Sequence, residues 1–278
     1  MHILYSIILG IIQGLSEFLP ISSTAHLTIA GKLMVLIDTA KPENWTAYIA
    51  VIQLGTLLSV IIYFYKDIKL IVESFIKENF LNRSKIRSQS LHSKLGWFII
   101  IGTAPIVTIG LIMKKIIEGN LTKDLSLISI NLIILAILLA IAELVSKRKK
   151  SIEQLKWQDS LIVGIAQCFA LFPGASRSGV TITAGLFLGI KREDAAKFSF
   201  LLSIPSVAAS GLLELYQSFK YLDNSGWLSM GIGILTAAIS GWLAIDFLLK
   251  YLRKNSTILF IIYRILLGAG ILIFLRAL

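Results

Sequence analysis

The chain has 278 residues, of which 56% are hydrophobic and 15% are charged, and its mean hydropathy is +0.80. This composition excludes an ordinary soluble domain and predicts an all-α integral membrane protein. The formal net charge of +11 does not indicate nucleic-acid binding, because the basic residues lie in short loops between apolar segments.

Ten apolar segments follow one another along the chain. Six are long enough to cross a bilayer as helices, which takes about 20 residues, and they cover residues 45–65, 95–113, 125–145, 197–217, 228–250 and 256–277. The other four are shorter and form two pairs, 3–18 with 21–37 and 158–172 with 178–190. A proline separates the members of each pair. We therefore expect each pair to be a re-entrant helical hairpin that enters and leaves the membrane on the same side.

The two hairpins contain ionisable side chains inside otherwise apolar sequence. The first holds Glu17 and His26, and the second holds Arg177 in the run PGASRSGVT at 173–181. A charged group at membrane depth costs about 2.5 to 3.5 kcal/mol on insertion scales, so such residues indicate function. We therefore expect both hairpins to build one functional site. Asp246 and Arg264, in neighbouring spans, are instead expected to form a structural ion pair.

The two halves of the chain resemble copies of one unit. GIIQ at 10–13 matches GIAQ at 164–167, and FLP at 18–20 matches LFP at 171–173. Each half has one hairpin and three spans, so the copies are inverted, and broken helices of inverted repeats meet near the bilayer midplane. This predicts a single membrane domain over 1–278, with the first repeat at 1–145 and the second at 146–278.

Basic residues set the expected orientation. If both hairpins return to the side from which they enter, the loops on one face carry 18 Lys and Arg residues and those on the other carry six. Because basic loops stay in the cytoplasm, we expect both termini to be external and the first hairpin to enter from the outer face.

Hydroxyl-rich turns beside Arg177 predict phosphate binding. The guanidinium is a bidentate fork for phosphate oxygens, and helix N-termini after Gly- or Ser-rich turns bind anions. The residues expected to contact phosphate are Gln13, Ser22, Thr24, Gly174, Ser176, Ser178 and Thr181. The alternative for the hydroxyl groups is helix capping, which is their commoner use.

Two catalytic schemes are open. In the first, Ser23 attacks phosphorus and His26, three residues further on, takes or delivers the proton. Glu17 orients His26 or a divalent ion, and Arg177 neutralises the phosphoryl oxygens. In the second, water attacks after activation by Glu17 or His26. The sequence does not separate the two schemes.

These motifs resemble those of the bacterial undecaprenyl-diphosphate phosphatase family, the bacitracin-resistance type. The resemblance rests on residues 10–26, on 173–181 and on FSFLLSIP at 198–205, and it extends over essentially the whole chain. It implies dephosphorylation of undecaprenyl diphosphate to undecaprenyl phosphate and inorganic phosphate in the bacterial inner membrane. This reaction recycles the lipid carrier of cell-wall synthesis and gives resistance to bacitracin.

The resemblance also implies a divalent cation, Mg²⁺ or Ca²⁺, which would suit carboxylate and phosphate oxygens. Glu17 is the one protein ligand expected, because the family carries Glu or Gln at the place of Gln13 and this chain has the amide. The expected partners are the lipid substrate and the bilayer, without nucleic acid. Both a monomer and a homodimer remain open.

An anion transporter or lipid flippase is the competing hypothesis, since inverted repeats with broken helices are common in transporters. Arg177 and hydroxyl-lined helix ends would suit it as well. The combination of Glu17, Ser23 and His26 favours an enzyme, because moving an anion across a membrane requires no proton-transferring group beside a hydroxyl.

Overall fold

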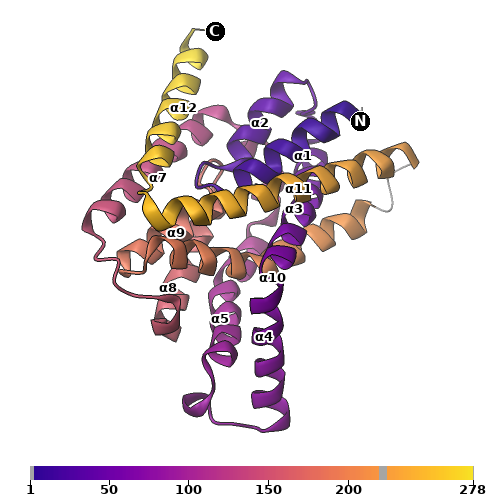
Figure 1. The fold of residues 1–278 in the computed structure, drawn as a ribbon. Helices are drawn as coiled ribbons and strands as arrows, with labels where there is room; N and C mark the ends of the chain where they lie inside the picture. The colour runs from indigo at the N-terminus through magenta and orange to yellow at the C-terminus, as the bar shows by residue number, and fades with distance from the viewer. Residues whose placement is uncertain (1–2, 219–223, 278) are drawn as a thin grey trace.

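The protein is built from helices (Figure 1). The computed structural model describes residues 3–218 and 224–277, and within these ranges there is no β-strand, only an isolated bridge between Lys150 and Ile190. The prediction of an all-α protein is confirmed.

In the described part of the chain, six helices are long and apolar enough to span a membrane, as the sequence predicts. They are α3 (Pro42–Tyr63), α5 (Leu91–Ile112), α7 (Leu125–Val145), α10 (Arg192–Ser218), α11 (Asn224–Lys254) and α12 (Ile258–Arg276). The remaining connecting helices are α4 (Tyr65–Ile76), α6 (Lys114–Glu118), η1 (Lys77–Leu81), η2 (Ile86–Ser88), η3 (Asn120–Lys123) and η4 (Ile152–Gln154). Helices α4 and α5 extend together from the rest of the molecule at the bottom of Figure 1.

The two short pairs form broken helices. In the first, α1 (Ile3–Phe18) precedes α2 (Ser23–Leu33), and in the second, α8 (Trp157–Gln167) and η5 (Cys168–Leu171) precede α9 (Arg177–Phe187).

Both breaks end in the same backbone conformation. Ser22 has φ 76° and Ser176 has φ 68°, and each serine hydroxyl accepts a hydrogen bond from the backbone N–H three residues further on. A positive φ outside glycine is uncommon. The two breaks therefore share a backbone conformation as well as similar residues.

Each broken helix packs on a span from the other half of the chain. Helix α1 packs against α11, and α8 packs against α5, which holds the corresponding place in the first half. Gly10 and Gly164, the first residues of GIIQ and GIAQ, permit these contacts. A Cβ on Gly10 would lie 2.5 Å from the Gly233 carbonyl oxygen, and one on Gly164 would lie 2.4 Å from that of Gly102. Small residues allow such close approach of helices in membranes. This packing of each broken helix on the other half of the chain brings the two breaks together.

Arg264 of α12 links the two breaks. Its side chain is fully buried, and the guanidinium donates to the carbonyl oxygens of Pro20 in the first break (3.4 Å) and of Gly174 and Ala175 in the second (3.3 and 3.0 Å). A fourth acceptor is the Leu132 carbonyl oxygen in α7 (3.3 Å). Non-helical backbone inside a membrane needs such partners, because water does not reach it there.

The predicted ion pair between Asp246 and Arg264 is wrong. Asp246 pairs with Lys250 one helical turn away (2.7 Å) and accepts a hydrogen bond from Tyr63 (3.2 Å). Arg264 is turned into the protein, where backbone carbonyl oxygens balance its charge.

Candidate active site

A cavity of about 360 Å³ lies where the two hairpins meet, beside α3, α5 and α10. Five of the residues that the sequence singles out line it: Glu17, Ser23 and Thr24 from the first hairpin, and Ser176 and Arg177 from the second. Helices α2 and α9 begin at this cavity, which places the positive ends of two helix dipoles there. The cavity is therefore suited to an anion.

Glu17 is the centre of the hydrogen-bond network in the cavity. Its Oε1 pairs with Nη2 of Arg177, which joins the two hairpins. Its Oε2 accepts hydrogen bonds from the hydroxyl of Ser23 (2.6 Å) and the amide of Gln13 (2.9 Å). Arg177 also donates to the hydroxyl of Ser206 in α10 (3.4 Å), a contact that the sequence did not indicate. The ion pair thus holds a carboxylate oxygen against the Ser23 hydroxyl.

His26 lies outside this network. Its Nδ1 is 2.7 Å from the Ser22 carbonyl oxygen, its Nε2 is 2.6 Å from the Tyr263 hydroxyl, and the His26 and Tyr263 rings stack with centroids 5.6 Å apart. A carbonyl oxygen only accepts, so in a neutral imidazole Nδ1 carries the proton and Tyr263 donates to Nε2. Both ring nitrogens are therefore engaged. The predicted pairing of His26 with Ser23 is not formed, because Ser23 donates to Glu17 instead.

Sequence reasoning missed Tyr263. It lies in α12, 237 positions from His26, and a single tyrosine in an apolar span is usually an interfacial residue. The one signal in the sequence was its neighbour Arg264, because a cation inside an apolar span needs polar partners. Those partners lie at the hairpin breaks, which this part of α12 contacts.

Two of the predicted phosphate contacts serve the backbone. Ser178 donates to the carbonyl oxygens of Glu17 (3.2 Å) and Leu19 (3.1 Å), and so satisfies the end of α1. Thr181 donates to the carbonyl oxygen of Arg177 (2.8 Å). Both side chains are buried and neither lines the cavity.

The turn residues have structural roles as well. Ser22 caps α2 and is 1% exposed, as the capping alternative predicts. Ser176 caps α9 but also lines the cavity, so it combines both uses. Gly174 has φ +81°, and a Cβ there would lie 2.4 Å from the Ile128 carbonyl oxygen. Gln13 reaches the site only through its hydrogen bond to Glu17.

Charged residues of α6, η3 and α10 also line the cavity. Lys114 pairs with Glu118 (3.3 Å) and Glu214 (3.9 Å). The ammonium of Lys123 donates to the Thr46 hydroxyl (2.6 Å) and to two backbone carbonyl oxygens. Burial lowers the pKa of Lys123 to about 8, and nearby carboxylates, that of Glu118 first, oppose this shift.

The donor set does not fit a divalent cation held by the protein. Within the described ranges, no group of three or more His, Cys, Asp or Glu side chains is placed to hold a metal ion. Glu17, the predicted ligand, already has its two oxygens engaged by Arg177, Ser23 and Gln13. The guanidinium would also repel a cation placed beside it.

Comparison with known proteins establishes the family. The family described as "Bacitracin resistance protein BacA" matches residues 6–270, which include both hairpin breaks. The chain belongs to this family. It is 53% identical to an undecaprenyl-diphosphatase of Syntrophobacter fumaroxidans over 272 residues, which cover 98% of this chain and 97% of the relative.

Other relatives of this BacA-family chain carry the same name. An undecaprenyl-diphosphatase of Chlorobium phaeobacteroides (strain BS1) is 47% identical over 98% of this chain and 96% of its own length. One of Myxococcus xanthus is 43% identical over 99% of this chain and 90% of its own length. The resemblance that the motifs indicate is confirmed over nearly the full length.

Proposed function

We propose that this BacA-family protein is a membrane phosphatase that converts undecaprenyl diphosphate to undecaprenyl phosphate and inorganic phosphate. The observation that carries the proposal is the Ser23 hydroxyl, which donates to Glu17 beside Arg177 in a cavity among apolar helices. The names of the relatives support an enzyme and give no support to a transporter. The reaction returns the lipid carrier to cell-wall synthesis and accounts for the family's link with bacitracin resistance.

The site positions the terminal phosphoryl group by charge. Arg177 and the N-termini of α2 and α9 meet at the cavity, and catalysis of phosphoryl transfer depends mainly on positioning and on stabilising the charge of the equatorial oxygens. The guanidinium is the group best suited to both tasks, because its fixed fork can hold two oxygens at once.

Ser23 is the nucleophile that the geometry favours. Its oxygen attacks the terminal phosphorus while its proton passes to Oε2 of Glu17, 2.6 Å away. The bond between that phosphorus and the bridging oxygen breaks, and undecaprenyl phosphate leaves with the bonding electrons. Water then hydrolyses the phosphoserine, with Glu17 returning its proton to the Ser23 oxygen. The scheme with water as the direct nucleophile uses the same carboxylate as base.

His26 takes a supporting role in this proposal. Its hydrogen bonds to the Ser22 carbonyl oxygen and to Tyr263 tie the start of α2 to α12. Because Ser22 is the N-cap and Ser23 is the first residue of α2, His26 would act by holding the turn that presents the nucleophile.

The cavity would be reached from the outer face of the inner membrane, with both termini external. The basic residues support this orientation, since 18 lie in loops on the face opposite the first hairpin and six on its own face. In a Cys168→Ala background, Lys41→Cys should react with a membrane-impermeant thiol reagent added outside cells, and Lys85→Cys should not. The reverse labelling pattern would contradict the orientation.

A divalent cation, Mg²⁺ or Ca²⁺, would arrive with the substrate. Both Glu17 oxygens already accept hydrogen bonds, so diphosphate oxygens and water would supply most of its ligands.

Phosphate release by purified protein tests the function. The unsubstituted protein in detergent should release inorganic phosphate from undecaprenyl diphosphate, and Glu17→Gln should abolish release without loss of folded protein. A matched control is Glu73→Gln, which alters an exposed carboxylate of α4 paired with Lys69. Intact diphosphate recovered after incubation with folded protein would reject the enzyme and favour the transporter hypothesis.

A further inference from the structure

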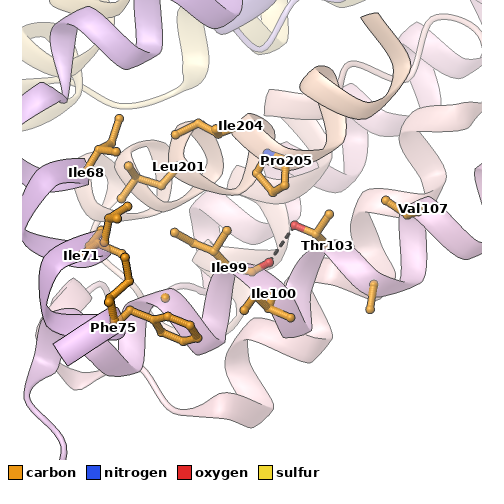
Figure 2. Close-up of a pocket in the computed structure, with 14 residues that line it drawn as sticks. Ile68, Ile71, Phe75, Ile99, Ile100, Thr103, Val107, Leu201, Ile204 and Pro205 are labelled. Atoms are coloured by element: carbon orange, nitrogen blue, oxygen red, sulfur yellow. Dashed lines mark hydrogen bonds between the residues drawn. The ribbon is translucent and has the colours of Figure 1, made fainter. Parts of the chain in front are cut away.

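A second cavity, of about 500 Å³, lies between α4, α5 and α10 (Figure 2). Of the 14 residues that line it, Thr103 alone has a polar side chain, and its hydroxyl donates to the Ile99 carbonyl oxygen (2.7 Å). Figure 2 shows Ile71 and Phe75 of α4 on one side of this space and Ile99 and Ile100 of α5 on the other. We call it the apolar groove. Its size is that of an ordinary ligand site, and its walls suit only an apolar occupant.

The apolar groove adjoins the catalytic cavity. Val107 of α5 lines both spaces. On α10, Pro205 lines the groove, whereas the next residue, Ser206, lines the catalytic cavity and accepts a hydrogen bond from Arg177 (3.4 Å). The groove therefore begins at Pro205, next to Ser206, and Ser206 is a hydrogen-bond partner of Arg177, the residue that would hold the phosphoryl group.

We infer that the apolar groove holds a segment of the substrate's prenyl chain, beyond the isoprene units nearest the diphosphate. This inference rests on the proposed function, which fixes the diphosphate at Arg177. A long prenyl chain must leave the catalytic cavity, and Lys114, Glu118, Lys123 and Glu214 line other parts of that cavity. On the side of Val107, which lines both spaces, the walls are instead apolar.

The groove selects by shape more than by hydrophobicity. Lipid tails are as apolar as leucine side chains, so exchanging a bilayer acyl chain for a prenyl chain gives no gain in buried apolar area. The gain comes from packing of the branched chain against Ile71, Phe75 and Ile204, which line the groove. Filling the groove should therefore change the apparent affinity by a modest factor and only for chains that reach it.

Chain-length discrimination tests the inference. Ile100 lies about two helical turns from Val107 on α5, so Ile100→Trp should obstruct the groove without altering the wall that the groove shares with the catalytic cavity. We expect KM for undecaprenyl diphosphate to rise about three- to tenfold, with kcat and the KM for farnesyl diphosphate unchanged. The matched control is Ile134→Trp on α7, because Ile100 and Ile134 are each 50% exposed and Ile134 lines neither cavity.

Three kinetic outcomes would overturn the inference: equal KM changes for both substrates, the same change in Ile134→Trp, or no change in Ile100→Trp. Failure of the proposed function is distinguishable, because the unsubstituted protein would then release phosphate from neither substrate.

A cross-linking measurement covers the case in which Ile100→Trp does not fold. A benzophenone amino acid placed at Ile100, or at Ile134 as control, is irradiated in lipid vesicles that contain undecaprenyl diphosphate. A prenyl adduct at the first position, well above that at the second, is expected by mass spectrometry. Adducts of bilayer lipid alone, or equal prenyl adducts at both positions, would assign the groove to ordinary membrane lipid and refute the inference.

Discussion

Replacing Arg264 by methionine should destabilise both hairpin breaks at once. Methionine keeps an unbranched apolar side chain of similar length but has no donor. The guanidinium donates to four carbonyl oxygens, two of them in the second break and one in the first. Without it, these acceptors lie in a region where the membrane and the protein exclude water.

The expected loss of stability is about 3 to 5 kcal/mol. A hydrogen bond from a charged donor contributes about 1.5 to 3 kcal/mol, and three of the four Arg264 bonds are long, at 3.3 to 3.4 Å. Removing the buried charge also relieves part of its desolvation cost, which keeps the total below the sum of the four bonds. For a chain of this size the loss corresponds to a fall of about 10 °C in the midpoint of thermal unfolding.

The chain carries a natural reporter for this experiment. Cys168 is its single cysteine and lies in η5 of the second hairpin, so a thiol-reactive fluorescent dye reports the opening of that hairpin on heating. Arg276→Met is the matched control, because Arg276 lies on the same helix but is exposed. The midpoint of the control should stay within about 2 °C of the unsubstituted protein. An unchanged midpoint in Arg264→Met, with full phosphatase activity, would refute the role of the guanidinium in satisfying the breaks.

Three further predictions concern the catalytic cavity. Ser23→Ala should lower kcat by more than about 1000-fold. Ser22→Ala, which removes a helix cap, should lower the free energy of unfolding by about 1 kcal/mol and lower kcat less than tenfold. If Ser23→Ala lowers kcat only about 10- to 100-fold, the effect of losing one binding hydrogen bond, direct attack by water is favoured. The pKa of Lys123, about 8 instead of 10.5, means that the folded protein loses this proton before the unfolded chain does as pH rises. Fold stability should then increase between about pH 8 and pH 10, while KM for the anionic substrate should rise through pH 8 as the positive charge disappears. Lys123→Arg should flatten this KM profile, and a KM that falls across the same range would contradict the assignment. Tyr263→Phe and His26→Ala should give non-additive losses of kcat in a double-mutant cycle, because the two side chains share one hydrogen bond; additive losses would argue against their direct contact.

The membrane class, the six spans and the two broken helices could be predicted from the sequence because each depends on local composition. A run of apolar residues long enough to cross a bilayer is visible without tertiary information. The breaks at Pro20 and Pro173 are visible because each proline stands between two apolar segments that are too short to cross, whereas Pro105 and Pro205 lie inside the long helices α5 and α10. The importance of Glu17 and Arg177 could be predicted for a similar reason. An ionisable residue in an apolar segment is costly in any arrangement that places the segment in a membrane.

The partners of the polar residues were decided by tertiary structure alone. Ser23 and His26 are close enough in sequence to pair, yet Ser23 donates to Glu17 across the first break and His26 bonds to Tyr263 in the last span. Arg264 was expected beside a carboxylate and instead satisfies backbone carbonyl oxygens of both breaks. Sequence spacing constrains contacts only within one helix. Contacts between helices depend on tertiary packing, in which each broken helix lies against a span from the other half of the chain. The close approaches at Gly10 and Gly164 exist only in the packed structure.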